Sequence, residues 1–267
     1  AISGVSHNGW YALSITYGRL QRLRPVVGYG GMADPNPDIP NPDNDGVFLL
    51  DLATGETRLV VSIATVYALL LERHPELAGR HMWFNHTVFN KDDTRCFFLA
   101  RVRASRWRPF QTAMLTANLD GSDIREVVPF GKSVSHFDWR NNCEIIATFK
   151  DGGSYKHVLF ADGGADYRTL DPEFLRGDGH CTFGPDQNWF ATDPWVPWTL
   201  SRRLLIYNVE TGSRHFVVDV PLGRYLVGDR RCDLHPRWKS TGDAICFDAI
   251  DKETGTRQLH VAELAWR

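Results

Sequence analysis

The sequence predicts an all-β fold, a β-propeller made of four-stranded blades. The first observation is a recurring motif in which a histidine stands three residues before an aromatic residue, and a polar turn and an apolar run follow. A strand, a tight polar turn and a second strand form a β-hairpin, because Asp, Asn, Gly and Pro favour the turn. The second observation is the spacing, since the aromatic residues of the motif lie 50, 44 and 55 residues apart. The four copies are His86–Phe89, His136–Trp139, His180–Phe183 and His235–Trp238.

The third observation is that a further hairpin follows the motif in each of the first three copies. Its turns are expected at Asp120-Gly121, Asp162-Gly163 and Thr211-Gly212, each between two apolar runs. Two hairpins supply four strands in about 40 to 60 residues, which is typical of a propeller blade. We expect five blades in a single domain that covers residues 1–267. Their approximate ranges are 1–62, 81–129, 134–172, 178–221 and 231–267.

The first blade is expected to contain a long insertion. Its hairpins are predicted at residues 5–14 and 47–61, and residues 19–45 between them are rich in Arg, Gly and Pro. Such a segment is expected to be a long, functional or disordered loop. Residues 63–77 have helical spacing and form the one helix that we expect. Because the chain starts inside a hairpin, we expect it to be part of a seven-bladed propeller whose N-terminal blades are missing.

Composition excludes several classes of function. The chain has 30 Lys and Arg against 32 Asp and Glu, so neither nucleic acid nor an anionic membrane is an expected partner. Its apolar runs are shorter than the ~18 residues of a membrane span. Five cysteines without a CxxC pair do not form a disulfide framework. Cys96, Cys143 and Cys246 lie in or beside apolar runs and are expected to be small core residues.

The motif histidines are the main candidates for a functional site. The first strand of each blade lines a propeller's channel, and residues at one repeat position point the same way. We therefore expect the four imidazoles to lie at one level of the channel. Imidazoles that converge in a polar cavity commonly bind a divalent metal, although channel histidines can also be held by hydrogen bonds alone. The candidate ligands are His86, His136, His180, Cys181 and His235, with Cys232 and Asp233 as possible replacements.

Other polar residues surround the motif. Asp178 and Asp233 stand two residues before a motif histidine, on the same strand face, and could orient its second nitrogen or bond to the next blade. Asn85 and Arg237 are suited to binding a substrate carboxylate. The chain also has nine tryptophans. Of these, Trp83, Trp107, Trp195 and Trp198 offer flat faces, and Trp195 or Trp198 could be a sugar-stacking platform or a blade-edge cover.

Several segments resemble a family, the seven-bladed β-propeller polysaccharide lyases. The resemblance is greatest to the ulvan lyase type and more distant to the oligogalacturonate lyases, and the turns resemble the TolB-like class of propellers. It covers most of the chain. The segments that carry it are Arg22–Pro25, Gly28–Gly30, His81–His86, Ser135–Arg140, Asp178–Cys181 and Arg231–Trp238.

The resemblance implies cleavage of a uronate-containing polysaccharide by β-elimination. A cationic or amide group would neutralise the uronate carboxylate, a His or Tyr base would remove the C5 proton, and an acid would protonate O4. It also implies a divalent metal, with zinc favoured and manganese or calcium as alternatives, and a secreted or periplasmic location. The family's catalytic histidines would lie largely in blades upstream of Ala1, and Tyr67 and Arg80 are loose candidates for its Tyr/Arg pair. The implied catalytic residues are Asn85, Arg237, Tyr29 and Arg24.

Two functions follow from these observations. The first is a polysaccharide lyase with a metal in the propeller channel, acting on an acidic polysaccharide or oligosaccharide. The alternative is a non-catalytic TolB-like propeller that binds a protein or glycan partner. The chain has no nucleotide-binding glycine loop, no Gly-x-Ser-x-Gly elbow and no His-Glu-x-x-His helix.

Overall fold

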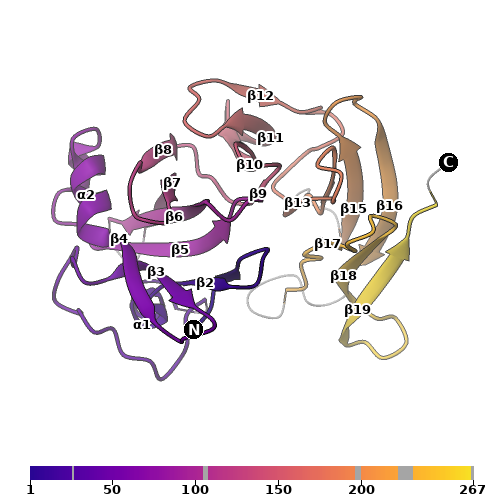
Figure 1. Cartoon of the computed structure of the whole chain (residues 1–267). Coiled ribbons are helices and arrows are strands. Elements are labelled where there is room, and N and C mark those ends of the chain that lie inside the picture. Colours follow the sequence, from indigo (N-terminus) through magenta and orange to yellow (C-terminus); the bar gives the residue numbers. More distant parts are fainter. Residues whose placement is uncertain (26, 105–107, 196–199, 222–230, 266–267) are drawn as a thin grey trace. The chain divides into compact units, whose positions relative to one another are not determined.

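The computed structural model describes residues 1–25, 27–104, 108–195, 200–221 and 231–265 (Figure 1). These residues form five antiparallel sheets, and in each sheet the strands are neighbours in the order of the sequence. The chain divides into two compact units, residues 1–133 and 134–267, and each unit is described by itself. None of the helices within the described ranges is both long enough and apolar enough to cross a membrane.

Unit 1 contains two four-stranded sheets. A tight turn closes each hairpin, and in the second hairpin of the first sheet Asp51 accepts backbone N–H bonds from Ala53 and Thr54 while Gly55 adopts a φ of 78°. The strands of the first sheet are β1 (Gly4–Val5), β2 (Tyr11–Ser14), β3 (Gly46–Asp51) and β4 (Thr57–Ser62). Those of the second sheet are β5 (Met82–Phe89), β6 (Arg95–Arg103), β7 (Phe110–Asn118) and β8 (Arg125–Val128).

The helical segments differ from the prediction. The expected helix is split into α2 (Ile63–Leu71) and a 3-10 turn, η1 (Pro75–Leu77), and Ser62 caps the start of α2 by accepting a bond from the Thr65 N–H. A second helix, α1 (Tyr17–Leu23), lies in the segment predicted to begin a long loop. The sequence pattern did not reveal it, because its buried face includes an arginine, Arg19.

Arg19 explains how the long segment after α1 is ordered. Its guanidinium is buried and donates to the backbone carbonyls of Met82 at 2.8 Å and of Ile39 at 3.3 Å, and also to that of Pro40. Asp34 lies 3.6 Å from it and forms a closer pair, 2.7 Å, with Arg22. The segment is thus held by charge-assisted hydrogen bonds rather than by apolar periodicity.

The core of unit 1 lies between its two sheets and α2. Large apolar side chains from both sheets and from the helix share one buried cluster, which is the usual solution for sheets that are apolar on one face. Its larger members include Leu13, Val66, Leu70, Trp83, Phe89 and Phe98.

Unit 2 contains two four-stranded sheets and one three-stranded sheet. The strands of the first are β9 (Phe137–Trp139), β10 (Glu144–Asp151), β11 (Ser154–Ala161) and β12 (Tyr167–Thr169). Those of the second are β13 (Cys181–Phe183), β14 (Trp189–Thr192), β15 (Ser201–Asn208) and β16 (Arg214–Pro221). Those of the third are β17 (Arg237–Trp238), β18 (Ala244–Ile250) and β19 (Arg257–Glu263).

The repeated motif connects neighbouring sheets within unit 2. The Asp138 carboxylate of β9 accepts the backbone N–H of Phe183 in β13 at 2.8 Å. The Trp238 indole of β17 donates to the Thr182 carbonyl at 3.0 Å and packs on Gly184, where a Cβ atom would lie only 3.3 Å from the ring. The recurring polar and aromatic residues therefore fasten each first strand to the next one.

The cysteines are free, and one of them was predicted wrongly. Cys96 is buried, and burial raises the pKa of its thiol to about 12. Cys246 is half-buried. Cys143 is exposed, because it lies in the polar turn between β9 and β10, where its N–H donates to the Asn141 side chain.

A fully buried histidine connects two sheets of unit 2. His157 of β11 lies 3.1 Å from the Leu175 carbonyl through Nδ1 and 2.9 Å from the Thr192 hydroxyl through Nε2. A carbonyl only accepts, so Nδ1 carries the proton and Nε2 accepts from Thr192. Burial lowers the pKa of His157 to about 4, and the ring is neutral in the folded protein at neutral pH.

This histidine should make the protein less stable as the pH falls. The unfolded chain protonates His157 near pH 6.5 and the folded chain only near pH 4, so stability is lost between these values. Between pH 7 and pH 5 we expect His157 alone to lower the free energy of unfolding by about 2 kcal/mol. Urea denaturation at the two pH values should show this difference reduced in His157→Asn, which keeps a donor for Leu175 but does not titrate. An unchanged difference would contradict this assignment.

Candidate metal centre

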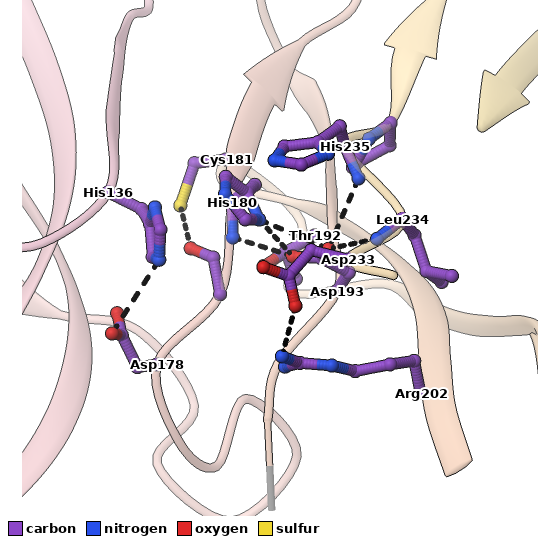
Figure 2. Close-up of polar contacts among 12 residues, drawn as sticks. His136, Asp178, His180, Cys181, Thr192, Asp193, Arg202, Asp233, Leu234 and His235 are labelled. Atoms are coloured by element: carbon purple, nitrogen blue, oxygen red, sulfur yellow. Dashed lines mark hydrogen bonds and ion pairs between the residues drawn. The ribbon is translucent and has the colours of Figure 1, made fainter. Parts of the chain in front are cut away.

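Three of the four motif histidines come together in unit 2 (Figure 2). The ring centroids of His136 and His180 are 3.8 Å apart, and those of His180 and His235 are 4.2 Å apart. His136 and His180 immediately precede β9 and β13, and His235 stands two residues before β17. The histidines therefore lie at the entrances to three first strands rather than within them.

A buried aspartate holds two of these histidines. Asp193, at the end of β14, is inaccessible to solvent and accepts the backbone N–H groups of His180 at 2.7 Å, Leu234 at 2.9 Å and His235 at 3.3 Å. Its carboxylate oxygens also lie 3.0 and 3.1 Å from Nδ1 of His180. His235 adopts a φ of 43°, which is uncommon for a residue with a side chain. One carboxylate thus fixes the backbone just before β13 and the backbone just before β17.

The charge of Asp193 sets the tautomer of His180. Burial opposes ionisation, but the charge and hydrogen bonds of His180, together with the charge of His136, lower the pKa of Asp193 to about 2. An ionised carboxylate only accepts hydrogen bonds, so Nδ1 of His180 donates to it. In the neutral imidazole Nε2 then carries a lone pair that is available to a metal ion.

A second aspartate completes the group. One ligand atom each from His180, Asp233 and His235 lie within 4.8 Å of one another. Asp233 is buried and paired with Arg202, and Arg231 donates to it at 2.9 and 2.5 Å. Although burial opposes it, these arginines lower the pKa of Asp233, so the carboxylate is ionised. Nδ1 of His235 lies 3.6 Å from Asp248, which resembles the arrangement of His180 and Asp193.

His136 lies beside this group with its own carboxylate. Its Nε2 is 3.6 Å from Asp178, and Thr148 connects the two residues by donating to Asp178 at 2.6 Å and accepting from the His136 N–H at 3.2 Å. Burial and then the charge of His180 lower the pKa of His136 to about 4. Burial, followed by the charge of His180, also lowers the pKa of His235. The lowered pKa values keep the His136 and His235 rings neutral at neutral pH, and neutral imidazoles are good metal ligands.

This donor set fits a divalent metal. Two imidazoles and a carboxylate are a common three-residue set for a catalytic ion, and such sites leave a position for water or substrate. The Asp193 carboxylate on Nδ1 of His180 is the kind of partner that orients a metal-binding imidazole, and Asp248 is a more distant charge, 3.6 Å from Nδ1 of His235. Nitrogen and oxygen donors suit zinc and manganese alike, so the donor set does not favour zinc in particular.

Cys181 and Cys232 do not belong to this group of close ligand atoms. The Cys181 thiol is buried and donates to the Gly179 carbonyl at 3.5 Å (Figure 2). Burial, and then the charges of three aspartates, raise its pKa far above the usual value, and burial also raises the pKa of Cys232. Both thiols are therefore protonated in the protein without a metal ion, and neither contributes an atom to the close group.

His86 differs from the other motif histidines. It lies in unit 1, where β5 has a bulge, because Asn85 pairs with Leu99 and Thr87 pairs with the adjacent Phe98. Its φ of 53° and exposed side chain show that the expected strand alternation is broken here. Asn85 is buried, and its side-chain oxygen accepts the His86 N–H at 3.0 Å while its Nδ2 has no partner within the described residues.

The other predicted binding residues are spread over both units. In unit 1, Tyr29 is exposed and stacks on Tyr17 with centroids 4.6 Å apart, and the Arg24 guanidinium lies 4.5 Å from the Phe110 ring centroid. In unit 2, Arg237 is exposed and donates to the neighbouring Pro236 carbonyl at 2.8 Å.

The remaining candidates were the aromatic platforms and the Tyr/Arg pair. Trp195 is 47% exposed and suited to stacking on a sugar, whereas Trp83 is buried and is not. Trp107 and Trp198 lie outside the described residues. The Tyr67 hydroxyl contacts Leu77 and Gly79, and Arg80 donates to Gln111 at 2.8 Å.

Sequence reasoning missed Asp193 and Arg202. Asp193 was not singled out, and its position one residue beyond the β14 pairing with β13 gave no repeat signal. A usable signal was that Asp193 follows the strand-forming run Phe190–Thr192 so closely. A charged residue next to a buried strand needs a hydrogen-bond or ion-pair partner.

Comparison with known proteins shows the fold class. No known protein-family model matches the chain, and no curated protein is similar to it in sequence. TolB from Acinetobacter baumannii has a TM-score of 0.59 at 12% identity, covering 98% of this chain and 51% of TolB. Oligogalacturonate lyase from Vibrio parahaemolyticus has a TM-score of 0.52 at 12% identity, covering 80% of this chain and 59% of the lyase. Acylaminoacyl peptidase from Pyrococcus horikoshii has a TM-score of 0.56 at 12% identity, covering 100% of this chain and 39% of the peptidase.

These likenesses confirm the predicted all-β propeller fold. At such identities they show the fold and not the activity. The chain spans only 51% and 59% of the TolB and lyase chains. The ulvan lyase type remains a prediction from the sequence.

The first prediction for this site concerns Asp193. Replacing it by Asn removes the charge and places an amide among donors, so the free energy of unfolding at pH 7 in the presence of a chelator should fall by about 2 to 4 kcal/mol. The contribution that Asp193 makes is present above pH 4 and is lost as the pH falls toward its folded pKa of about 2. Metal affinity should also fall about 10- to 100-fold, because His180 loses its orienting partner.

Urea denaturation and metal titration check this expectation. Asp219→Asn is the matched control, since Asp219 is 43% exposed and lies 3.8 Å from Arg203. It should change stability by less than about 0.5 kcal/mol. Equal effects of the two variants would show that Asp193 does not organise the site.

Proposed function

We propose that this protein binds a divalent metal through His180, His235 and Asp233 and acts as a lyase on an acidic polysaccharide or oligosaccharide. The observation that carries the proposal is the convergence of three ligand atoms within 4.8 Å, with Asp193 behind one imidazole and Asp248 behind another. Asp193 holds Nδ1 of His180 and leaves Nε2 free for an ion, as in sites where a carboxylate orients a metal-binding imidazole.

The charges around this group suit an anionic ligand. Arg231 and Arg237 are exposed beside Asp233 and His235, so their guanidiniums can contact a carboxylate from solvent. Arg202 is buried, lies 5.8 Å from the Trp195 ring centroid and is paired with Asp233. Trp195 therefore offers an exposed aromatic face next to a cationic side chain, which is a suitable surface for an acidic sugar.

The chemistry follows from the acidity of a uronate. A bound divalent ion would supply positive charge to the uronate carboxylate and make its C5 proton easier to remove. Asp193 holds Nε2 of His180 ready for the ion, and Asp233 supplies the negative charge of the ligand set. Arg231 and Arg237 orient the sugar carboxylate. In β-elimination a base takes the C5 proton, a double bond forms between C4 and C5 as the bond between C4 and O4 breaks, and an acid protonates the departing O4. The ulvan lyase type and the preference for zinc enter this proposal from the sequence alone.

Metal content is the direct test. Purified protein loaded with zinc or manganese should contain about one ion per chain by elemental analysis, and His180→Ala and His235→Ala should fall to background. His215→Ala is the matched control, because His215 is exposed on β16 and contacts Trp189 rather than the proposed ligands. Retention of the metal in both site variants, or absence of metal from the wild type after loading, would overturn the proposed site.

Activity separates the lyase from the binding alternative. Incubation with uronate-containing polysaccharides, ulvan among them, should produce the ultraviolet absorbance of an unsaturated uronate, and His180→Ala should abolish it. Binding of one metal ion without turnover of any such polymer would refute the lyase assignment while leaving the metal site intact. That result would favour the TolB-like binding propeller.

A further inference from the structure

A cluster of arginines in unit 1 has no acidic partner among the described residues. The guanidinium carbons of Arg24, Arg101 and Arg103 lie 4.5, 4.8 and 5.8 Å from the centroid of one ring, that of Phe110. Arg101 and Arg103 leave β6 on the same face, and Phe110 begins β7 directly opposite Arg103. Arg24 joins them from the end of α1. We refer to these three arginines and Phe110 as the arginine cluster.

The positive charge of this cluster is not compensated within the described part of the chain. No ion pair joins Arg24, Arg101 or Arg103 to a carboxylate there, whereas Arg19 and Arg22, on the same helix as Arg24, share Asp34. Burial and then the charge of Arg24 lower the pKa of Arg101 to about 9. Burial and then the charge of Arg103 lower the pKa of Arg24. The arginines thus repel one another and remain charged at neutral pH.

Two donors of the cluster are buried and have no hydrogen-bond partner among the residues that the structure describes. They are Nη1 of Arg101 and Nε of Arg103. Arg101 is only 4% exposed, and its one hydrogen bond is from Nε to the Thr112 hydroxyl at 3.3 Å. A buried charge without a counter-ion destabilises a folded protein. Several cationic side chains with buried free donors around one ring therefore point to an external anion that completes the cluster.

A cavity gives access to this part of unit 1. Its volume is about 670 Å³, within the usual range for a small-ligand site, and Arg103 lines it together with Arg22, Arg80, His81 and Trp83. Trp83 meets Phe110 edge to face at 6.2 Å. The indole nitrogen of Trp83 is also a buried donor without a partner within the described ranges. The cavity wall is therefore rich in hydrogen-bond donors and contains no carboxylate.

We propose that the arginine cluster binds the oxyanion group of a small ligand, a carboxylate or a sulfate ester. Guanidinium forks match both groups through paired N–H bonds, and the Phe110 face holds the arginines in position. The site belongs to unit 1, whereas the proposed metal ligands belong to unit 2, so it does not depend on the proposed function.

The test is calorimetric titration with galacturonate and, separately, with sodium sulfate at constant ionic strength. Wild type should bind at least one of them, and Arg101→Met should bind it at least tenfold more weakly. Arg101→Met should also raise the melting temperature in the absence of the anion, because it replaces an unpaired buried charge by an apolar chain of similar length. Binding of galacturonate alone identifies the carboxylate, and binding of sulfate alone identifies the tetrahedral anion.

Control variants keep this test decisive. Arg58→Met should bind as wild type does, since Arg58 is exposed and donates only to the Leu119 carbonyl. If Arg101→Met does not fold, Arg24→Met, at the less buried end of α1, should show the same loss of affinity. His180→Ala should retain anion binding, which separates this site from the metal centre. Equal affinity in wild type and in the folded arginine variants, or no binding of either anion to wild type, would overturn the proposal.

Discussion

The carboxylate of Asp193 is the interaction on which the candidate site depends. It is buried, ionised and surrounded by donors from two loops that precede neighbouring first strands. Hydrogen bonds to a buried charge are stronger than neutral ones, and the surrounding medium has a low dielectric. One side chain therefore fixes the backbone of His180 and His235 and also the ring of His180. Without it, the His180 ring loses its hydrogen-bond partner and the His235 backbone loses an acceptor.

The propeller fold places such loops where a ligand can reach several of them. Each first strand of unit 2 is fastened to the next by the motif residues, as Asp138 with Phe183 and Trp238 with Thr182 show. The residues just before these strands include the histidines. In each repeat the residues that fasten the strands therefore stand beside the histidine of the candidate site. This explains why a single motif predicted both the fold and the histidine site.

The repeat period predicted the fold well, because hairpins and blades leave regular traces in turn residues and apolar runs. It predicted the histidine site less completely. His136, His180 and His235 meet, but the bulge at His86 breaks the alternation on which the prediction relied. Asp193 and the helix around Arg19 escaped notice, because buried charged residues depend on partners that are distant in the sequence. Periodicity reports local geometry and not the three-dimensional pairing of charges.

The most direct measurement of the central claim is anomalous X-ray diffraction from crystals soaked in zinc or manganese. If the site binds a metal, we expect one strong peak about 2.0 to 2.2 Å from Nε2 of His180 and from a nitrogen of His235. Nδ1 of His180 should still donate a hydrogen bond to Asp193. A peak bound elsewhere, or no peak near these histidines in metal-saturated crystals, would contradict it. The three imidazoles would then be a hydrogen-bonded cluster that holds neighbouring loops together.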